Sequence, residues 1–338
     1  MKILQRIFIL ALCLLSLSCH KQEEWKNNAQ GNFDALWTII NEHYCFFEYK
    51  HLDWNAVGEK YRAKVLPNMT NTELFDLCAE MLKELQDGHV NLISGYDVSR
   101  YYIWEQYPLN YYERIIDENY LHFDYHKSSG IKYQILSNNI GYMRYGSFST
   151  NIGEGNLDNI LFFLSTADGL IIDVRSNGGG YLANVETLVG RFINDEINAG
   201  AVSHKTGPGA NDFSEPFAYT IKPAPTSRIH FQKPVVVLAN RGSFSATNNF
   251  VSIMKSLPNV RIVGDTTGGG SGLPFTADLP NGWTVRFSAC SITDAQGRIT
   301  EFGVEPSPNC KVDITDADLA AGKDAILEHA FTVIQQMQ

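Results

Sequence analysis

One serine, Ser245, has the setting that a nucleophilic hydroxyl needs. An apolar, β-branched segment, 234–240, predicts a buried strand before it, and 250–254 carries helical spacing after it. At such a junction the free amide hydrogens and the positive dipole end of the helix can stabilise the negative charge that develops in acyl transfer. The simpler interpretation is that Ser243 or Ser245 caps the helix, and this segment alone favours a cap.

Other segments offer the remaining parts of a serine hydrolase site, which are a base, a group that orients the base, and donors for an oxyanion. His89 follows a helical stretch in an Asp-Gly turn, and Glu301 lies in a turn after a strand. The segment 171–181 runs from a strand into three glycines whose amides could face a ligand. Each feature also has a structural interpretation: a turn histidine, a surface carboxylate and, for Asp173 with Arg175, an ion pair beneath the glycines.

The elements that must position these residues change along the chain. Apolar residues recur with helical spacing over 33–92, which predicts an N-terminal helical module. Aromatic residues crowd 93–127 without that spacing, which is typical of strand and packing residues. After 132, strands and helices alternate, which predicts an α/β body. The predicted strands of this body are 142–145, 169–175, 234–240 and 260–263. A hairpin at Asn281-Gly282 and a closing helix over 316–336 follow.

The N-terminus predicts export. A short basic region precedes an apolar run over 7–17 that is too short to span a membrane, and Ser18 and Cys19 come next. This pattern is typical of a signal peptide, 1–18, that ends in a lipoprotein-type cleavage site. We therefore expect a protein of the cell envelope, held on the periplasmic face or the cell surface by a lipid on Cys19. A plainly secreted protein is the alternative.

The composition argues against several kinds of partner. With 27 basic and 37 acidic residues, the formal net charge is −10, so nucleic acid is not expected to bind. Cys45, Cys78, Cys290 and Cys310 lack the close pairs of a zinc site, and no close His, Asp and Glu spacing predicts another metal. The three glycines lack the patterns of nucleotide sites. We expect no metal and no cofactor, while disulfides among these cysteines stay open.

Together these segments resemble a known family. The stretch 169–181 is similar to the Gly-Leu-Ile-Leu-Asp-Leu-Arg-x-Asn-x-Gly-Gly signature of the tail-specific, or C-terminal processing, serine peptidases, and 235–270 resembles their nucleophile segment. One branch of that family uses a Ser-Lys dyad, but Gly269 stands at the position of the lysine. The other branch resembles the tricorn protease core and takes a histidine from an Asp-Gly-His-like motif and a glutamate from Glu-x-Gly-Val-x-Pro. This chain has both motifs.

The resemblance implies a nucleophile, a general base, a group that orients or tunes the site, and oxyanion donors. In that order these are Ser245, His89, Glu301 and the amides of Ala246 and of Gly179 or Gly178. If His89 is the base, activity should fall below about pH 6, near the ordinary histidine pKa. Two departures concern this site: Asn248 stands where many relatives carry Glu, and Gly88 stands where the tricorn core has a serine.

The resemblance also implies the architecture. We expect a signal peptide (1–18), a helical module (19–92), an aromatic-rich β bridge (93–135) and an α/β peptidase core of Clp protease/crotonase-like fold (136–338). The bridge is too short for the PDZ domain of many relatives. The expected activity is hydrolysis of peptide bonds in a peptide or protein substrate. The alternative is a catalytically silent member that binds a peptide or apolar ligand in the same cleft. The oligomeric state stays open.

Overall fold

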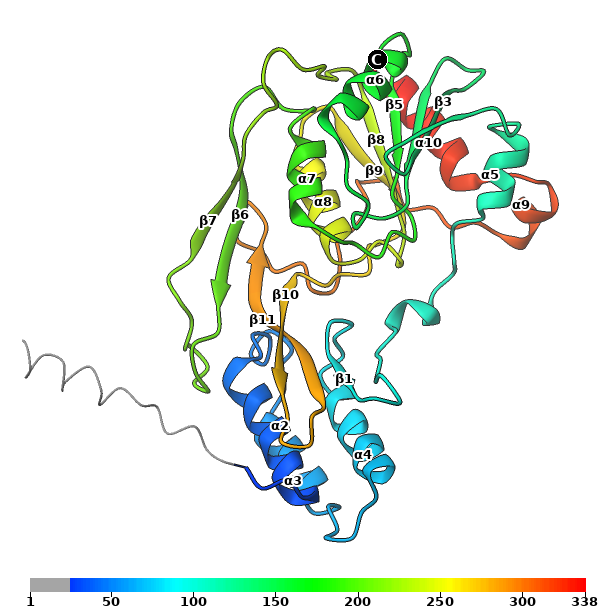
Figure 1. The fold of residues 1–338 in the computed structure, drawn as a ribbon. Coiled ribbons are helices and arrows are strands. Elements are labelled where there is room, and N and C mark those ends of the chain that lie inside the picture. Colours follow the sequence, from blue (N-terminus) through cyan, green and yellow to red (C-terminus); the bar gives the residue numbers. More distant parts are fainter. Residues whose placement is uncertain (1–24) are drawn as a thin grey trace, which may run out of the picture.

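The computed structural model describes residues 25–338, which form two parts joined by long strands (Figure 1). One part is a six-stranded sheet with helices on both faces, and the other is a set of three helices packed on a second sheet. The predicted signal peptide and Cys19 lie outside the described residues. Within 25–338, no helix has both the length and the apolar character needed to cross a membrane.

Three helices form the N-terminal module: α2 (Ala29–His43), α3 (Trp54–Arg62) and α4 (Asn71–Lys83). Each begins where a polar side chain accepts a hydrogen bond from an amide of the first turn, and these side chains are Asn28, Asp53 and Thr70. The apolar faces of the helices meet in a core that includes Val285 and Phe287 of the second sheet. The helical spacing over 33–92 therefore corresponds to helices that share one core.

The second sheet is antiparallel and consists of β1 (Asn91–Ile93), β6 (Ile197–His204), β7 (Phe217–Ile221), β10 (Gly272–Asp278) and β11 (Thr284–Thr293). Strand β11 is central. It pairs with β10 along one edge, while β1 and β6 pair with its two ends along the other. The Asn281-Gly282 hairpin predicted from the sequence is confirmed, and Gly282 has the positive φ, 83°, that this turn requires.

The six-stranded sheet has the order β2-β3-β4-β5-β8-β9. Its strands are β2 (His126–Ser128), β3 (Ile131–Ile135), β4 (Gly141–Tyr145), β5 (Leu170–Asp173), β8 (Val235–Ala239) and β9 (Val260–Gly264). Strands β4, β5, β8 and β9 run parallel, and all four predicted strands of the α/β body are confirmed in them. They are apolar and almost wholly buried because both faces of the sheet are covered.

Helices cover the two faces of this sheet (Figure 1). On one face lie α6 (Glu154–Leu164), α7 (Leu182–Val189) and α8 (Ala246–Lys255). On the other face lie α5 (Glu113–Asn119) and α10 (Ala325–Met337). The chain leaves the carboxyl ends of β5 and β8 to enter α7 and α8. Ligands of open α/β sheets bind at that edge.

The segment 93–135 differs from the β bridge that its aromatic residues predict. It contains a 3-10 helix, η1 (Ile103–Gln106), and helix α5, which the sequence pattern did not indicate. Helix α5 has only seven residues and buries only Ile116, so it leaves no periodic apolar pattern. Strand β2 pairs with β3, and β3 pairs with β4, so both strands extend the six-stranded sheet.

The closing helix predicted over 316–336 consists of two helices, α9 (Asp316–Ala320) and α10. Gly322, with a φ of 65°, lies between them. Asp324 then begins α10 by accepting a hydrogen bond from the Leu327 amide at 2.9 Å. The same carboxylate accepts hydrogen bonds from Arg175 in the core.

Candidate active site

Ser245 stands at the junction of β8 and α8, one residue before the helix begins. Its φ of 60° is rare for a residue other than glycine and is typical of strained turns at functional sites. Its side chain makes no cap hydrogen bond. The hydroxyl of Ser243 donates to the carbonyl of Val174 at 2.8 Å and accepts from the Asn240 amide at 3.1 Å. The capping interpretation is therefore wrong for both serines.

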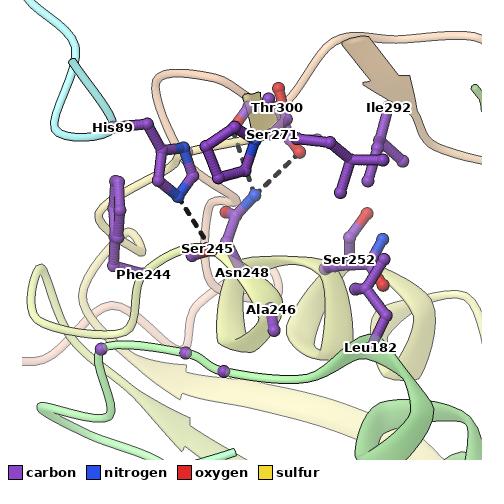
Figure 2. Close-up of a pocket in the computed structure, with 18 of the residues that line it drawn as sticks. His89, Leu182, Phe244, Ser245, Ala246, Asn248, Ser252, Ser271, Ile292 and Thr300 are labelled. Carbon is purple, nitrogen blue, oxygen red and sulfur yellow. Dashed lines mark hydrogen bonds between the residues drawn. The ribbon is translucent and has the colours of Figure 1, made fainter. Parts of the chain in front are cut away.

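His89 lies in the turn between α4 and β1, and its Nε2 is 2.9 Å from the Oγ of Ser245 (Figure 2). The two residues are 156 positions apart in the chain. The amide of His89 donates to Asp87 Oδ1 at 2.7 Å, and its ring packs on Phe244 with the ring centroids 4.7 Å apart. Nδ1 of His89 is buried and has no hydrogen-bond partner among residues 25–338.

Burial decides the protonation of His89. The residue is only 2% exposed, and desolvation lowers its pKa to about 4. The Asp87 carboxylate acts in the opposite direction, while Arg286 and Lys50 lower this pKa further. The neutral imidazole is therefore the form present at neutral pH. This is the form that a general base needs.

Glu301 forms no hydrogen bond with the ring of His89. Its Oε1 accepts from the Nζ of Lys50 at 3.0 Å, and its Oε2 accepts from the Ser271 amide at 2.9 Å. Burial raises the pKa of Glu301 to about 8, the Asp87 charge adds to the rise, and Lys50 opposes it. The carboxyl group therefore exchanges protons close to neutral pH. Its hydrogen bonds reach Lys50 and the Ser271 amide, so Glu301 has no direct bond with which to orient the imidazole.

Two further residues of this site, Asp87 and Lys50, were not predicted from the sequence. Asp87 accepts hydrogen bonds from the hydroxyls of Tyr44, at 3.0 Å, and Ser288, at 2.9 Å. Burial raises its pKa, but Lys50, His89 and the hydrogen bonds outweigh that effect and lower the pKa below its usual value. Its place two residues before the histidine could have identified it. Nothing in the local sequence distinguishes Lys50 from a surface lysine.

The glycine loop lies against the start of α8. A Cβ on Gly179 would lie 2.8 Å from the Cβ of Ser245 and 3.0 Å from the nitrogen of Ala246, and φ here is 99°, so glycine is required. The amide of Ala246 belongs to the first helical residue and has no acceptor within the helix. The amide of Gly179 donates to Asn177 Oδ1 at 3.0 Å, so it must exchange that partner to bind an oxyanion. Beside Gly178 the space is open.

Two of the unusual positions have a structural explanation. Gly269, at the position of the lysine in the Ser-Lys branch, has a φ of 80°, and a Cβ there would meet the Glu301 carbonyl oxygen at 1.8 Å. A lysine does not fit at this point. Asn248 donates to the hydroxyl of Thr300 at 2.9 Å and accepts from the hydroxyl of Thr267 at 2.6 Å. It thereby ties α8 to the turn that carries Glu301.

A cavity of about 490 Å³ opens at Ser245 and is lined by residues of both parts of the molecule. Leu182 and Ile292 lie to one side of Ser245, and Phe244 lies to the other (Figure 2). Hydroxyl and amide groups, including that of Asn249, interrupt the apolar walls. A cavity of this size and mixed lining suits one side chain and the backbone of an extended peptide.

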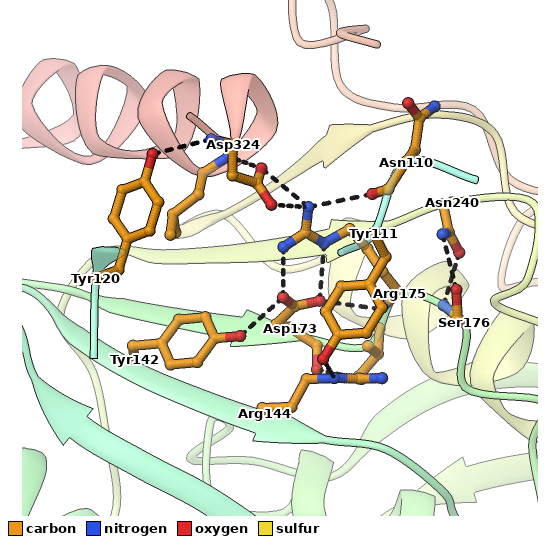
Figure 3. A network of polar contacts seen from close by, with 12 residues as sticks. Asn110, Tyr111, Tyr120, Tyr142, Arg144, Asp173, Arg175, Ser176, Asn240 and Asp324 are labelled. Carbon is orange, nitrogen blue, oxygen red and sulfur yellow. Dashed lines mark hydrogen bonds and ion pairs between the residues drawn. The ribbon is translucent and has the colours of Figure 1, made fainter. Parts of the chain in front are cut away.

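A buried ion network lies beneath the glycine loop (Figure 3). Arg175 binds Asp173 at 2.6 Å and Asp324 at 2.8 Å, and none of the three side chains is more than 1% exposed. Tyr142 donates to Asp173 at 2.9 Å, and Arg144 donates to its carbonyl oxygen at 3.0 Å. The structural pair predicted for Asp173 and Arg175 is confirmed. The network fixes the end of β5, from which the glycine loop starts.

No group of His, Cys, Asp and Glu side chains in 25–338 is arranged to hold a metal ion. The four cysteines of this range, Cys45, Cys78, Cys290 and Cys310, are free and buried.

Two family models match parts of the chain. The family model "Peptidase family S41" matches residues 139–309, and the model "Tricorn protease C1 domain" matches 25–83. The carboxy-terminal processing protease CtpA of Bacillus subtilis (strain 168) is 28% identical over 175 residues, a match that covers 51% of this chain and 35% of that protein. The chain thus matches about a third of this curated relative.

Solved structures show the same fold. A candidate peptidase from Parabacteroides merdae ATCC 43184 is 45% identical, with a TM-score of 0.87, over 91% of this chain and 97% of that one. The tricorn protease is 16% identical, with a TM-score of 0.52, over 92% of this chain and 37% of that one, a likeness of fold alone. The S41 model matches about half of the chain, and it includes the nucleophile segment and the turn that carries Glu301. The chain belongs to peptidase family S41.

Proposed function

We propose that this chain is a serine peptidase that hydrolyses peptide bonds through an acyl-enzyme on Ser245. The observation that carries the proposal is the 2.9 Å contact between Ser245 Oγ and His89 Nε2 in the wall of a cavity. A silent member that only binds a peptide or apolar ligand needs no such pair. A serine in a strained turn, hydrogen-bonded to a buried histidine of lowered pKa, favours catalysis over binding alone.

These residues can carry out acylation and deacylation with a named donor and acceptor for each proton. Ser245 Oγ attacks the peptide carbonyl carbon while its proton passes to His89 Nε2. The carbonyl oxygen becomes an oxyanion that receives hydrogen bonds from the amide of Ala246 and from Gly179 or Gly178. The carbon–nitrogen bond then breaks, and the leaving nitrogen takes the proton from His89. Water then attacks the ester carbon while its proton passes to His89 Nε2. The bond from this carbon to Ser245 Oγ breaks as Oγ takes that proton, and the acid and the free serine are released.

Asp87 supports the base in this mechanism. Its hydrogen bond from the His89 amide fixes the turn that carries the imidazole. Its negative charge raises the pKa of His89 against the effect of burial, so it favours the imidazolium that forms during attack. We assign Glu301 a tuning role, because its carboxyl group contacts Lys50 and the Ser271 amide rather than the imidazole.

The proposed substrate is an extended peptide or protein segment. A second cavity, of about 350 Å³, is lined by Pro108 and Leu109 of the segment 93–135 and shares Gly178 and Phe244 with the first cavity. The ring of Phe244 packs on His89, which must protonate the leaving amine. The second cavity therefore lies on the side of the leaving group. We assign it to the residues that follow the cleaved bond.

The location is proposed from the N-terminal sequence. The basic region, the apolar run over 7–17 and Cys19 support export and a lipid anchor on the cell envelope. The acidic net charge of −10 argues against nucleic acid as a partner. Intact mass of the membrane fraction tests the anchor: a diacylglyceryl mass on Cys19 that disappears in Cys19→Ala supports it, and an unmodified, soluble product overturns it.

Hydrolysis of an unfolded protein such as casein tests the peptidase activity. The parent should release new peptide amino groups, and Ser245→Ala should release none above background. Ser256→Ala is the matched control, because this exposed serine ends the same helix and donates only to the Ile253 carbonyl at 2.7 Å. Equal release by Ser245→Ala and the parent would overturn the proposal.

A further inference from the structure

Lys50 is a buried lysine at the boundary between the two parts of the molecule. It comes from the turn after α2, and its side chain is only 5% exposed. Its Nζ donates to the carbonyl oxygens of Leu85, at 3.0 Å, and Gln86, at 3.2 Å, and to Glu301 Oε1 at 3.0 Å. It also lies 3.7 Å from Asp87 Oδ2. A single ammonium group therefore contacts two separate turns.

Both turns belong to the catalytic site. The carbonyls of Leu85 and Gln86 come directly before the turn in which Asp87 accepts the His89 amide at 2.7 Å. Glu301 belongs to the other turn, which Asn248 ties to α8 through its bonds to Thr300. The base is therefore linked through Lys50 to the same turn that is linked to the helix of the nucleophile.

The surroundings of Lys50 do not suit a lysine that only fills space. Aromatic rings of Tyr44, Phe46 and Phe302 lie 5.6 to 5.8 Å from its Nζ. An apolar side chain would pack against such rings without the cost of removing an ammonium group from water. The ammonium group is stabilised here by the surrounding carbonyl and carboxyl oxygens and by the faces of these rings. The ammonium charge and its N–H donors are therefore what distinguish Lys50 from an apolar side chain at this position.

We propose that Lys50 is a positioning residue of the peptidase site: it fixes the turn that carries His89 against the turn that carries Glu301, and it balances the buried charge of Asp87 beside them. The kinetic part of this proposal rests on the proposed peptidase function. It gives the helical module a part in catalysis, because the module supplies a group that holds the base within reach of Ser245.

The charge of Lys50 also affects the pKa of His89. The charged groups that face His89 and Lys50 are Asp87 and Arg286, and Glu301, with its pKa raised to about 8, is charged only in part near neutral pH. The neutral titratable neighbours of Lys50 are Tyr44, Cys45, Tyr49 and Tyr101. Lys50 lowers the pKa of His89, and Asp87 raises it. Removing the lysine charge leaves Asp87 less opposed, so the pKa of His89 should rise.

The test compares Lys50→Met, Lys50→Gln and Lys50→Arg with a matched control, Lys60→Met. Lys60 belongs to the same module but is exposed, and its ammonium group contacts the Glu84 carboxylate and the Tyr61 ring rather than any residue of the site. With folding checked for each, Lys50→Met should lower kcat by roughly tenfold to a hundredfold, as small misplacements of a base do, with a smaller change in KM. Its acid limb should move to higher pH. Lys50→Arg should recover part of the activity, and the control should match the parent.

A second measurement needs no activity. The pKa of the His89 imidazole, followed by NMR in the folded proteins, should be higher in Lys50→Met than in the parent and unchanged in Lys60→Met. Lys50→Gln, which keeps donors for the carbonyls without the charge, replaces Lys50→Met if that variant does not fold. An uncharged, folded variant with the kcat and His89 pKa of the parent overturns the proposal. If the parent cleaves nothing, the proposed function fails, and the NMR titration still decides the role of Lys50.

Discussion

The acid limb of activity should lie near pH 4, well below that of an ordinary histidine. At pH 5, a histidine with the usual pKa of about 6.5 is only about 3% neutral, whereas one with a pKa of about 4 is about 90% neutral. Only the neutral imidazole can accept the proton of Ser245. The value of kcat/KM at pH 5 should therefore keep about nine tenths of its plateau, roughly 30-fold more than an ordinary histidine allows. Burial moves the limb below the value of about pH 6 that the sequence predicts.

The assay is kcat/KM for a fluorogenic peptide between about pH 3.5 and 8 at constant ionic strength, with folding checked at each pH and Ser245→Ala as the background. A second inflection near pH 8 is expected from Glu301, whose pKa is raised to about 8. An acid midpoint near 6.5 in a protein that stays folded would refute the claim that the base acts from its buried position.

Two further substitutions test the scaffold of the site. Arg175→Met leaves the buried carboxylates of its network uncompensated, so it should lower the free energy of unfolding by about 3–5 kcal/mol in urea. The exposed Arg114→Met should cost less than about 1 kcal/mol, and equal losses would contradict the network's role. Because the pKa of Asp173 is lowered in the folded protein, the stability that its pairing with Arg175 contributes should be present in full above the unfolded pKa of about 4. This stability should decrease as the pH falls from there through the lowered pKa. Gly179→Ala, with its Cβ 2.7 Å from the Phe244 carbonyl oxygen, should lower kcat roughly a hundredfold. A Cβ at Gly178 meets no atom within 4 Å, so Gly178→Ala should cost far less; equal losses in the two variants would contradict the claim that close contacts at Gly179 cause the loss.

Strong local patterns made most of the fold predictable. The β-branched runs 234–240 and 260–263 and the Asn281-Gly282 turn specify their elements from adjacent residues alone, and the structure confirms them. Weak or interrupted patterns did not. Helix α5 is too short to show a period. The break at Gly322 precedes Asp324, whose ion pair with the distant Arg175 the local pattern does not indicate.

The residues of the site that lie in distinctive local motifs were predictable from the sequence. Ser245 and His89 each lie in a distinctive local sequence, and the structure brings their side chains together. Lys50 carries no such signal, because its contact with Glu301 joins residues 251 positions apart. The position of Glu301 was equally hidden: its motif indicates a turn, but only the fold decides that its carboxyl group meets Lys50 rather than the imidazole.

Covalent labelling tests the central claim most directly, namely that Ser245 is a nucleophile activated by His89. The folded protein is treated with a fluorophosphonate, and peptide mass spectrometry locates the adduct. We predict one adduct, on Ser245, that is lost in Ser245→Ala and His89→Ala and retained in Ser256→Ala. A folded parent without an adduct, or with its adduct on another serine, would contradict the claim.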